Sequence, residues 1–545
     1  MTDCAALDSA ATIKGVKFTG TVLRRSVFAL LLSFAPLYAA TPAALPAVPP
    51  TVESITPTEL RMHLEFLASD ELGGRYTLSP NFAIAARYLA TQLEAYGFKG
   101  GAHGSFLQTF DVISTKPDTA KTVLEITTKG KTSTLKFGED FLISSVGAPG
   151  EAQGPIVYVG AGVSAPAQKH DDYEGKDVRG KIVLVVPTLP SGLDAAAIKE
   201  DQQGVGAARA HGATGVLVIP PQRLADFMKD KNVVQRFASR ESVTLAKESE
   251  GRLPAVTLTP DTAEKLLSAM GMDLKSVYAS VSKKEPVEAK KLDASAHITV
   301  SMQQVRTTTQ NVVGVLEGTD PQLKNEYVVF SAHYDHLQTS PKGEIYHGAD
   351  DDGSGTSAVL AIARAMSLQP PKRSVVVVFH AGEELGLLGS QYNTDVAPAV
   401  PLEKIVVDLN IDMIGRSKPK GDNQPEDEHL TDANTVYLVG SNRASSELHE
   451  LSEETNSQFQ RLKLDYYYND PQNPERIYYR SDHWNYAKHG VPVIFYFDGT
   501  HVDYHRPTDT VNKIDFSKMT QITRLIFETG WRIANLDHRL VRNQN

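Results

Sequence analysis

The chain has 545 residues, of which 41% are hydrophobic and 22% are charged, a composition that is ordinary for globular proteins and sufficient for about two or three domains. Its formal net charge of −10 offers no basic field to collect phosphates, and the sequence has neither a lysine- and arginine-rich stripe nor a glycine-rich phosphate-binding loop. Composition and charge therefore argue against nucleic acid as a partner.

The segment 1–40 has the layout of a secretory signal peptide. Basic residues precede the apolar stretch 27–40, VFALLLSFAPLYAA, and a proline-rich linker at 41–52 follows it. The apolar stretch is too short to span a bilayer stably, so we expect cleavage and no stable membrane insertion afterwards. The only cysteine, Cys4, lies in this leader, so the mature chain would have neither a disulfide nor a thiol nucleophile. These features predict a periplasmic or secreted bacterial protein.

Two helices are expected at the start of the mature chain. The segment 57–67 follows a capping residue, Thr56, and carries leucines along one face. A second helix is expected between Pro80 and Gly97, with the glycine as its C-terminal cap. Residues 53–135 are expected to form the N-terminal part of the larger domain.

Between about residues 120 and 300, short β-type runs such as TVLEITT, PIVYVG, KIVLVV, GVLVI and PAVTL are separated by glycine and proline. One helical pattern, AAAIKEDQQGVGAARAHGA, lies among them. The segment has no cluster of histidine, aspartate and glutamate at ligand spacing. We therefore expect a separate, small β-rich domain at 136–295, inserted into the larger domain as a scaffold or lid.

Residues 296–545 alternate strands with helices. Near-continuous Val, Ile and Phe runs predict strands that are covered on both faces, namely NVVGVLEG, EYVVFSAHYD, SVVVVFHAGEE, VVDLNIDMIG, TVYLVG and VPVIFYFDG. Helices are expected over 355–369 and 516–535. The predicted fold class is α/β, a mixed and largely parallel sheet flanked by helices, in which ligands bind beyond the carboxyl ends of the strands.

Acids or histidines follow four of these strands, at the edge where a ligand would bind. They are His333 and Asp335, Glu383 and Glu384, Asp412, and Tyr504 with His505. The loop GADDDGSG at 348–355 adds three aspartates. Histidines and carboxylates without cysteine favour zinc or a similar divalent ion.

The number of candidate ligands exceeds the roughly three that one catalytic zinc ion takes from the protein. Two ions about 3.5–4 Å apart that share one carboxylate would use the surplus. Neighbouring side chains at a strand end point in different directions, so one of Glu383 and Glu384 can bind a metal while the other acts as a general base. Asp335, two residues after His333, can orient the imidazole of that histidine.

Five motifs in order, AHYDHL, GADDDGSG, HAGEELGLLGS, NIDMIG and DYHRPTDT, resemble the zinc-dependent M28 family of co-catalytic metallopeptidases, whose secreted aminopeptidases are its best-known members. The insertion resembles a protease-associated domain, and LEFLASDELGGR resembles the N-terminal helix region of the family. The resemblance covers nearly the whole mature chain.

The resemblance implies two Zn²⁺ ions per chain. It assigns His333 and Asp412 to one ion, Glu384 and His505 to the other, and Asp351 as the bridge between them. Two of the loop's three aspartates, Asp350 and Asp352, stand where the family commonly has asparagine, which leaves the choice of bridging residue open. The resemblance also implies a cis peptide bond after Asp351.

The same resemblance makes Glu383 the general base and Asp335 the partner of His333. Tyr504 resembles the tyrosine that some members direct at the developing oxyanion, although packing beneath its loop explains it equally well. His336, His347, His380 and His483 have no ligand position left and are expected to support the site or the turns around it. The aromatic segment 464–479 and the sequence Arg480-Ser481-Asp482 are candidates for the substrate pocket.

The predicted function is that of an exopeptidase that removes N-terminal residues from peptide substrates. An M28-type carboxypeptidase is the main alternative, but the acids around the metals and the absence of an evident arginine pair favour an α-ammonium over an α-carboxylate. A receptor or binding protein on an inactive peptidase scaffold is the second alternative. Such a protein would be expected to have lost ligands or Glu383, and none is missing. The sequence does not define the oligomeric state.

Overall fold

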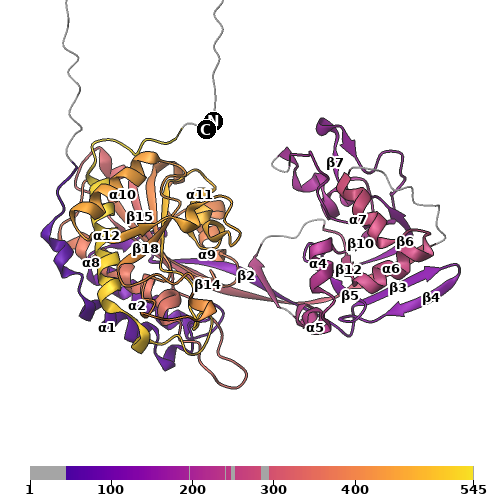
Figure 1. Cartoon of the computed structure of the whole chain (residues 1–545), viewed down its shortest axis with the longest axis horizontal. Helices are drawn as coiled ribbons and strands as arrows, with labels where there is room; N and C mark the ends of the chain where they lie inside the picture. The colour runs from indigo at the N-terminus through magenta and orange to yellow at the C-terminus, as the bar shows by residue number, and fades with distance from the viewer. Residues whose placement is uncertain (1–44, 195–196, 240, 247–251, 284–293, 544–545) are drawn as a thin grey trace, which may run out of the picture. The chain divides into compact units, whose positions relative to one another are not determined.

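The computed structural model describes residues 45–194, 197–239, 241–246, 252–283 and 294–543 (Figure 1). The expected signal peptide at 1–40 and Cys4 lie outside these residues. Within them, no helix combines the length and the apolar character that crossing a membrane requires.

The larger domain is built on a ten-stranded sheet. Its strand order is β11-β2-β14-β16-β15-β17-β20-β18-β19, and β1 pairs with β14. The strands are β1 (Lys99–Gly100), β2 (Leu107–Pro117), β11 (Ser242–Leu245), β14 (Met302–Leu316), β15 (Tyr327–His333), β16 (Ser374–His380), β17 (Ile405–Ile411), β18 (Thr435–Val439), β19 (Lys463–Asp465) and β20 (Val493–Phe497).

The central strands β16, β15, β17 and β20 run parallel to one another. Antiparallel pairing joins β14 to β16 and β18 to β20 on the two sides of this core. The fold is thus a mixed α/β sheet, which confirms the predicted class.

Helices cover both faces of this sheet. The helices are α1 (Pro57–Leu67), α2 (Phe82–Ala95), α8 (Gly355–Leu368), α9 (Leu388–Gln391), α10 (Ser446–Gln458), α11 (His483–Ala487) and α12 (Phe516–Asn535). Helices α1, α2, α8 and α12 pack together, and α10 packs on α12, as Figure 1 shows. Helix α1 begins as expected, because the Thr56 side chain accepts a hydrogen bond from the Glu59 N–H.

Two adjacent residues of β15 show why its hydrophobic run is unbroken. Phe330 packs on α12, where a Cβ at Gly530 would lie 2.3 Å from its ring, so the glycine permits the close approach. Val329 faces the opposite side and belongs to a buried cluster with Tyr486 of α11. Both faces of the strand are therefore buried, and a continuous apolar sequence is the result.

A second sheet of eight strands, with the order β4-β3-β13-β6-β9-β10-β12-β5, contains all five β-type runs noted between residues 120 and 300. Its strands are β3 (Val123–Thr128), β4 (Lys131–Leu135), β5 (Phe141–Ile143), β6 (Gly150–Tyr158), β9 (Ile182–Val185), β10 (Gly215–Val218), β12 (Ala255–Leu258) and β13 (Ala294–Val300), and a separate ribbon pairs β7 (Ser164–Ala165) with β8 (His170–Asp171).

The structure corrects the expected limits of the inserted domain. The hairpin β3–β4 pairs with β13, so the eight-stranded sheet begins before residue 136, and β13 itself crosses the expected boundary at 295. Strand β11 lies within the expected insertion but pairs with β2 of the larger sheet. The pattern of short β-type runs could not reveal these limits, because similar runs form strands of both sheets.

The insertion also contains more helix than a β-rich domain implies. Its helices are α3 (Gly204–Ala210), α4 (Gln222–Phe227), α5 (Lys231–Ser239), α6 (Pro260–Ala269) and α7 (Leu274–Lys283). Among the described residues of the helical pattern predicted within 195–213, the structure has a short 3-10 helix at Glu200–Gln202 followed by α3. This helix begins at Gly204, whose φ of +53° does not continue a helix toward the N-terminus.

Asp408, in the middle of β17, is a fully buried carboxyl group that gives a first testable prediction. The Ser331 hydroxyl donates to its Oδ1 at 2.7 Å, while burial raises the pKa of Asp408 to about 8. Between about pH 4 and this value the folded chain holds a proton that the unfolded chain has released, so this group lowers stability as pH rises.

The substitution Asp408→Asn is expected to remove this loss of stability at higher pH. Relative to the wild type, the free energy of unfolding should increase by about 2 kcal/mol more at pH 8 than at pH 6. Urea unfolding of both proteins at the two pH values measures the difference. An effect of the same size at both values would show that Asp408 does not hold the proton.

Candidate metal centre

The predicted site residues meet at one edge of the larger sheet. His333 is the last residue of β15, Glu383 and Glu384 follow β16, Asp412 follows β17, and His505 lies in the loop after β20. Because these strands are parallel, their carboxyl ends share an edge. The loop Ala349–Ser354, which leads into α8, brings Asp351 to the same place.

One group of side chains contains His333, Asp351 and Asp412, all buried. The Nε2 atom of His333 lies 3.3 Å from Asp351 Oδ1 and 3.4 Å from Asp412 Oδ1. Each residue offers one ligand atom, and these atoms lie within 4.8 Å of one another. The group has the geometry of a site that could hold a metal ion.

A second group adjoins the first and uses the other oxygen of Asp351. The Nε2 atom of His505 lies 3.1 Å from Asp351 Oδ2 and 3.1 Å from Glu384 Oε2. His336 also lies here, with its Nδ1 atom 2.8 Å from Glu384 Oε1 and 3.7 Å from Asp351 Oδ2. Asp351 therefore contributes one carboxylate oxygen to each group.

The chemistry of these groups fits a divalent metal. His333 Nε2, Asp351 Oδ2 and Glu384 Oε1 are buried and have no hydrogen-bond partner among the residues that the structure describes. Most buried polar atoms in proteins are hydrogen-bonded, so unpaired atoms that converge on one place need a ligand. Imidazole nitrogen and carboxylate oxygen together suit zinc.

The carboxylates and histidines at this edge shift one another's pKa values. Burial alone would lower the pKa of His505, but the adjacent carboxylates of Asp351 and Glu384 raise it to about 10. Burial alone would raise the pKa of Asp351, whereas the histidines around it hold that pKa well below its usual value. A metal ion would take the place of the protons on these histidines, so metal binding would release protons.

Glu383 lies beside the two groups without belonging to either. It lines a small pocket together with Asp351, Asp412 and Tyr504. Burial raises the pKa of Glu383 well above its usual value; the charge on His333 opposes that rise, while Glu384 adds to it. A carboxyl group with these properties suits proton transfer.

Asp335 connects His333 to Glu383. Its Oδ1 atom accepts a hydrogen bond from the Glu383 N–H at 3.1 Å and lies 3.7 Å from His333 Nδ1, which is 3.2 Å from the Asp335 carbonyl oxygen. The other oxygen, Oδ2, accepts from the Thr77 hydroxyl at 2.9 Å. The structure therefore brings Asp335 to its expected partner and adds Thr77, which sequence reasoning missed.

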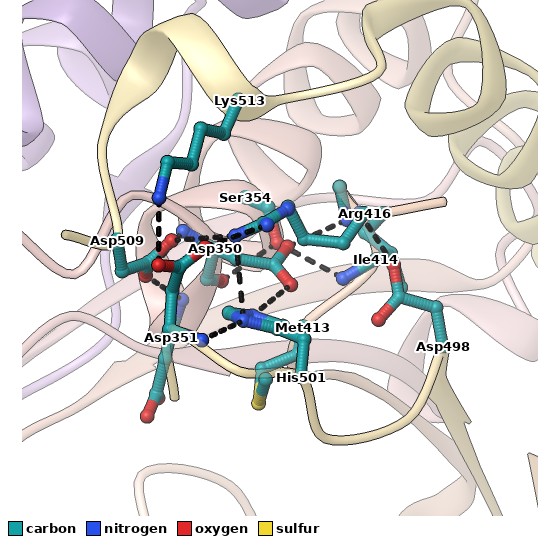
Figure 2. A network of polar contacts seen from close by, with 12 residues as sticks. Asp350, Asp351, Ser354, Met413, Ile414, Arg416, Asp498, His501, Asp509 and Lys513 are labelled. Carbon is teal, nitrogen blue, oxygen red and sulfur yellow. Dashed lines mark hydrogen bonds and ion pairs between the residues drawn. The ribbon is translucent and has the colours of Figure 1, made fainter. Parts of the chain in front are cut away.

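A polar network fixes the backbone that carries Asp351 (Figure 2). The Oδ2 atom of Asp509 accepts hydrogen bonds from the N–H groups of Asp350 and Asp351, at 2.9 and 3.2 Å. Asp350 Oδ1 accepts from the Gly415 N–H at 2.6 Å, and its Oδ2 lies 3.2 Å from His501 Nε2. The side chain of Asp350 is thus used within this network.

Asp352 points into the start of helix α8 instead. Its Oδ1 atom accepts hydrogen bonds from the N–H groups of Gly355 and Met413, at 2.8 and 3.3 Å. Of the loop's three consecutive aspartates, Asp351 is the one whose carboxylate reaches both histidine-containing groups. The Asp351–Asp352 peptide bond is cis, as the resemblance implied.

Arg75 supports the same loop from the N-terminal part of the chain. This fully buried guanidinium donates to the carbonyl oxygens of Leu67, Tyr334, His347 and Gly348, at 2.6 to 2.9 Å. It joins the segment after α1 to the chain on both sides of His336. The only sequence signal for Arg75 was its place in LEFLASDELGGR.

Tyr504 and Ile477, which belongs to the segment 464–479, form part of the pocket wall. The Tyr504 ring stacks on His505 with the ring centroids 3.9 Å apart, and burial raises the pKa of its hydroxyl above the usual value. Ile477, Arg480, Phe495 and Phe497 line the same pocket. The pocket therefore combines apolar side chains with carboxylates and one guanidinium.

Three of the other histidines lie outside the two groups. His347 pairs with Asp70 at 2.8 Å, and His380 lies 3.3 Å from the Tyr486 hydroxyl. His483 stacks on Phe495. These positions agree with their expected supporting roles.

A mixed α/β sheet whose parallel strands end in two adjoining histidine–carboxylate groups defines an α/β protein with a candidate dinuclear metal centre. Residues 311–530 match the model of peptidase family M28. All the predicted ligands and Glu383 lie within the matched residues.

Relatives of known name match shorter segments. Aminopeptidase YwaD of Bacillus subtilis (strain 168) is 33% identical over 141 residues, which make up 26% of this chain and 29% of the relative. The probable leucine aminopeptidase 2 of Aspergillus oryzae (strain ATCC 42149 / RIB 40) is 38% identical over 120 residues, 22% of each chain. The chain thus spans less than a third of the length of either relative.

The solved structure of an aminopeptidase from Aneurinibacillus sp. strain AM-1 has a similar fold. Its TM-score is 0.54 at 17% sequence identity, over 91% of this chain and 98% of that one. At this identity the likeness concerns the fold alone.

Proposed function

We propose that the protein is a secreted di-zinc exopeptidase that hydrolyses N-terminal residues from peptides. The observation that carries the proposal is the placement of Asp351, which gives one oxygen to each of two histidine–carboxylate groups, with Glu383 beside them. The match of residues 311–530 to the model of peptidase family M28 and the relatives named aminopeptidase support the same proposal.

In this proposal His333 and Asp412 would hold one zinc ion, Glu384 and His505 would hold the other, and Asp351 would contribute one carboxylate oxygen to each. The pair of ions, when bound, lowers the pKa of a water molecule and polarises the scissile carbonyl group. The surrounding side chains would transfer the protons and orient the substrate.

Glu383 is the proposed general base. It is close to the two groups but is not one of their ligands, so its lone pairs remain free to accept a proton from the attacking water and return it to the leaving amine. Asp335 accepts a hydrogen bond from the Glu383 N–H at 3.1 Å and so fixes the position of Glu383 relative to His333. Tyr504, which lines the same pocket, is the proposed donor to the developing oxyanion.

The pocket suggests what the substrate looks like. Ile477, Phe495 and Phe497 would receive an apolar side chain, while the carboxylates at the metal groups would attract the α-ammonium of a free N-terminus. Arg480 in the same lining is the observation that favours the carboxypeptidase alternative, since a guanidinium binds an α-carboxylate.

A set of peptides, each prepared with a free and with an acetylated N-terminus, distinguishes these possibilities. The purified protein with zinc is expected to remove residues one by one from the free N-termini alone, with apolar first residues fastest, as followed by mass spectrometry. Trimming from the C-termini regardless of acetylation would establish the carboxypeptidase. The absence of any cleavage would favour a binding protein on a peptidase scaffold.

Export and the inserted domain complete the proposal. The layout of residues 1–40 supports secretion or a periplasmic location, as argued from their sequence. The strands of the eight-stranded sheet match the β-type runs that resemble a protease-associated domain, which supports that assignment for the insertion.

A further inference from the structure

We infer that His336 is an additional protein ligand at the metal position formed by Asp351, Glu384 and His505. The inference rests on the proposed two-metal site and changes its description, because the resemblance to the family left this histidine without a ligand role. It would give the second metal position four protein ligands and leave the first with three.

The distances around Glu384 support a common centre. This carboxylate lies between two imidazoles, with Oε1 2.8 Å from His336 Nδ1 and Oε2 3.1 Å from His505 Nε2. Both nitrogens also face Asp351 Oδ2, at 3.7 and 3.1 Å. Metal–ligand bonds of about 2.0–2.1 Å place tetrahedral ligand atoms about 3.3 Å apart, and the four distances bracket that separation.

The surroundings of His336 fit a metal ligand. Its side chain is fully buried, and its Nδ1 atom lies 2.8 Å from the buried Glu384 Oε1. The Nε2 atom has no hydrogen-bond partner among the described residues. A buried imidazole nitrogen that faces the carboxylate oxygens of Glu384 and Asp351 belongs to the set of ligand atoms that zinc takes from proteins.

The backbone holds His336 where it can act in this way. Its N–H donates to the Arg75 carbonyl oxygen at 3.3 Å, and the guanidinium of Arg75 donates to the carbonyl oxygens of His347 and Gly348. A Cβ at residue 348 would lie 2.6 Å from the His336 ring, so only glycine lets the loop close over it. The position of the ring is thus fixed before any ion binds.

The consequence is an asymmetric pair of metal positions. The position with His336 would be more fully coordinated by protein and would hold its ion more tightly. The position of His333, Asp351 and Asp412 would keep more room for water and substrate, as catalytic zinc sites do. The first ion to bind is therefore expected at His336.

Cadmium provides a probe that reads the donor atoms directly. Wild-type protein, His336→Ala and His336→Gln are stripped of metal and reloaded with ¹¹³Cd²⁺, and their ¹¹³Cd NMR spectra are recorded. Two resonances are expected for the wild type. In both variants one resonance should move, because an oxygen replaces a nitrogen donor, while the other stays in place.

Zinc titration of the metal-free proteins gives an independent readout. The affinity for the tighter of two ions is expected to fall at least about tenfold in both His336 variants. His347→Ala is the matched control, since it removes a neighbouring histidine that pairs with Asp70 instead of the metal groups. Circular dichroism of each metal-free variant checks that it is folded, and the glutamine variant keeps a polar side chain at the position.

The outcomes separate this inference from the proposed function. If the wild type binds two ions and both His336 variants keep both ¹¹³Cd resonances in place, His336 is not a ligand although the two-metal proposal stands. If the wild type binds fewer than two ions, the two-metal proposal and the inference both fall. If one resonance moves in the His336 variants but not in His347→Ala, the inference holds.

Discussion

Glu383→Ala is expected to lower kcat by about 10²–10⁴-fold while the protein keeps its two zinc ions. The physical reason is that Glu383 lines the pocket next to Asp351 and Asp412 but contacts neither histidine-containing group as a ligand would. The substitution removes a proton acceptor and leaves the ligand set intact. Peptide hydrolysis at saturating substrate, together with zinc analysis of the purified variant, measures both quantities.

The adjacent residue provides the control for this experiment. Glu384→Ala removes a carboxylate that lies 2.8 Å from His336 and 3.1 Å from His505, so it is expected to lose zinc along with activity. If Glu383→Ala lost the metal and Glu384→Ala kept it, the roles of the two glutamates would have to be exchanged.

Asp351→Ala is expected to have the largest effect on metal binding. Its carboxylate is shared, with one oxygen 3.3 Å from His333 Nε2 and the other 3.1 Å from His505 Nε2. Removing it takes a ligand from both positions at once, so zinc content should fall below one ion per chain and activity by more than about 100-fold. Elemental analysis after dialysis and a peptide hydrolysis assay give the two values.

The neighbouring aspartate is a matched control for the bridge. Asp352 Oδ1 accepts hydrogen bonds from the N–H groups of Gly355 and Met413, and an asparagine oxygen can accept them as well. Asp352→Asn should therefore retain both zinc ions. Loss of zinc from this variant, with retention in Asp351→Ala, would move the bridge from Asp351 to Asp352.

The central part of the larger domain could be predicted because its signals are local. Strands that are buried on both faces need continuous apolar runs. Acids or histidines stand at or soon after the ends of β15, β16 and β17, where each buried run stops. His333, Glu384 and Asp412 could be found in this way, since parallel strands bring their ends to one edge. Helices α1, α8 and α12 lie within a few residues of their expected limits.

Long-range supports could not be predicted, because no local pattern marks them. Asp509 accepts hydrogen bonds from the backbone of a loop 159 positions earlier, and Thr77 donates to Asp335, which lies 258 positions later. The sequence gives His336 no ligand role, because other residues already account for every expected ligand position. Its closeness to Glu384 depends on how the loop at Gly348 folds over the ring, which spacing alone does not encode.

The strand order of the larger sheet also bears on how the protein is made. Strand β20 lies between β17 and β18, although it leaves the ribosome after both. A gap must therefore stay open in the sheet until residues 493–497 have been synthesised, and His505 follows only after that. Until then the nascent chain exposes unpaired strand edges and an incomplete edge rich in carboxylates. Neither the sheet nor the metal groups can be completed before β20 and the loop that carries His505 have been made.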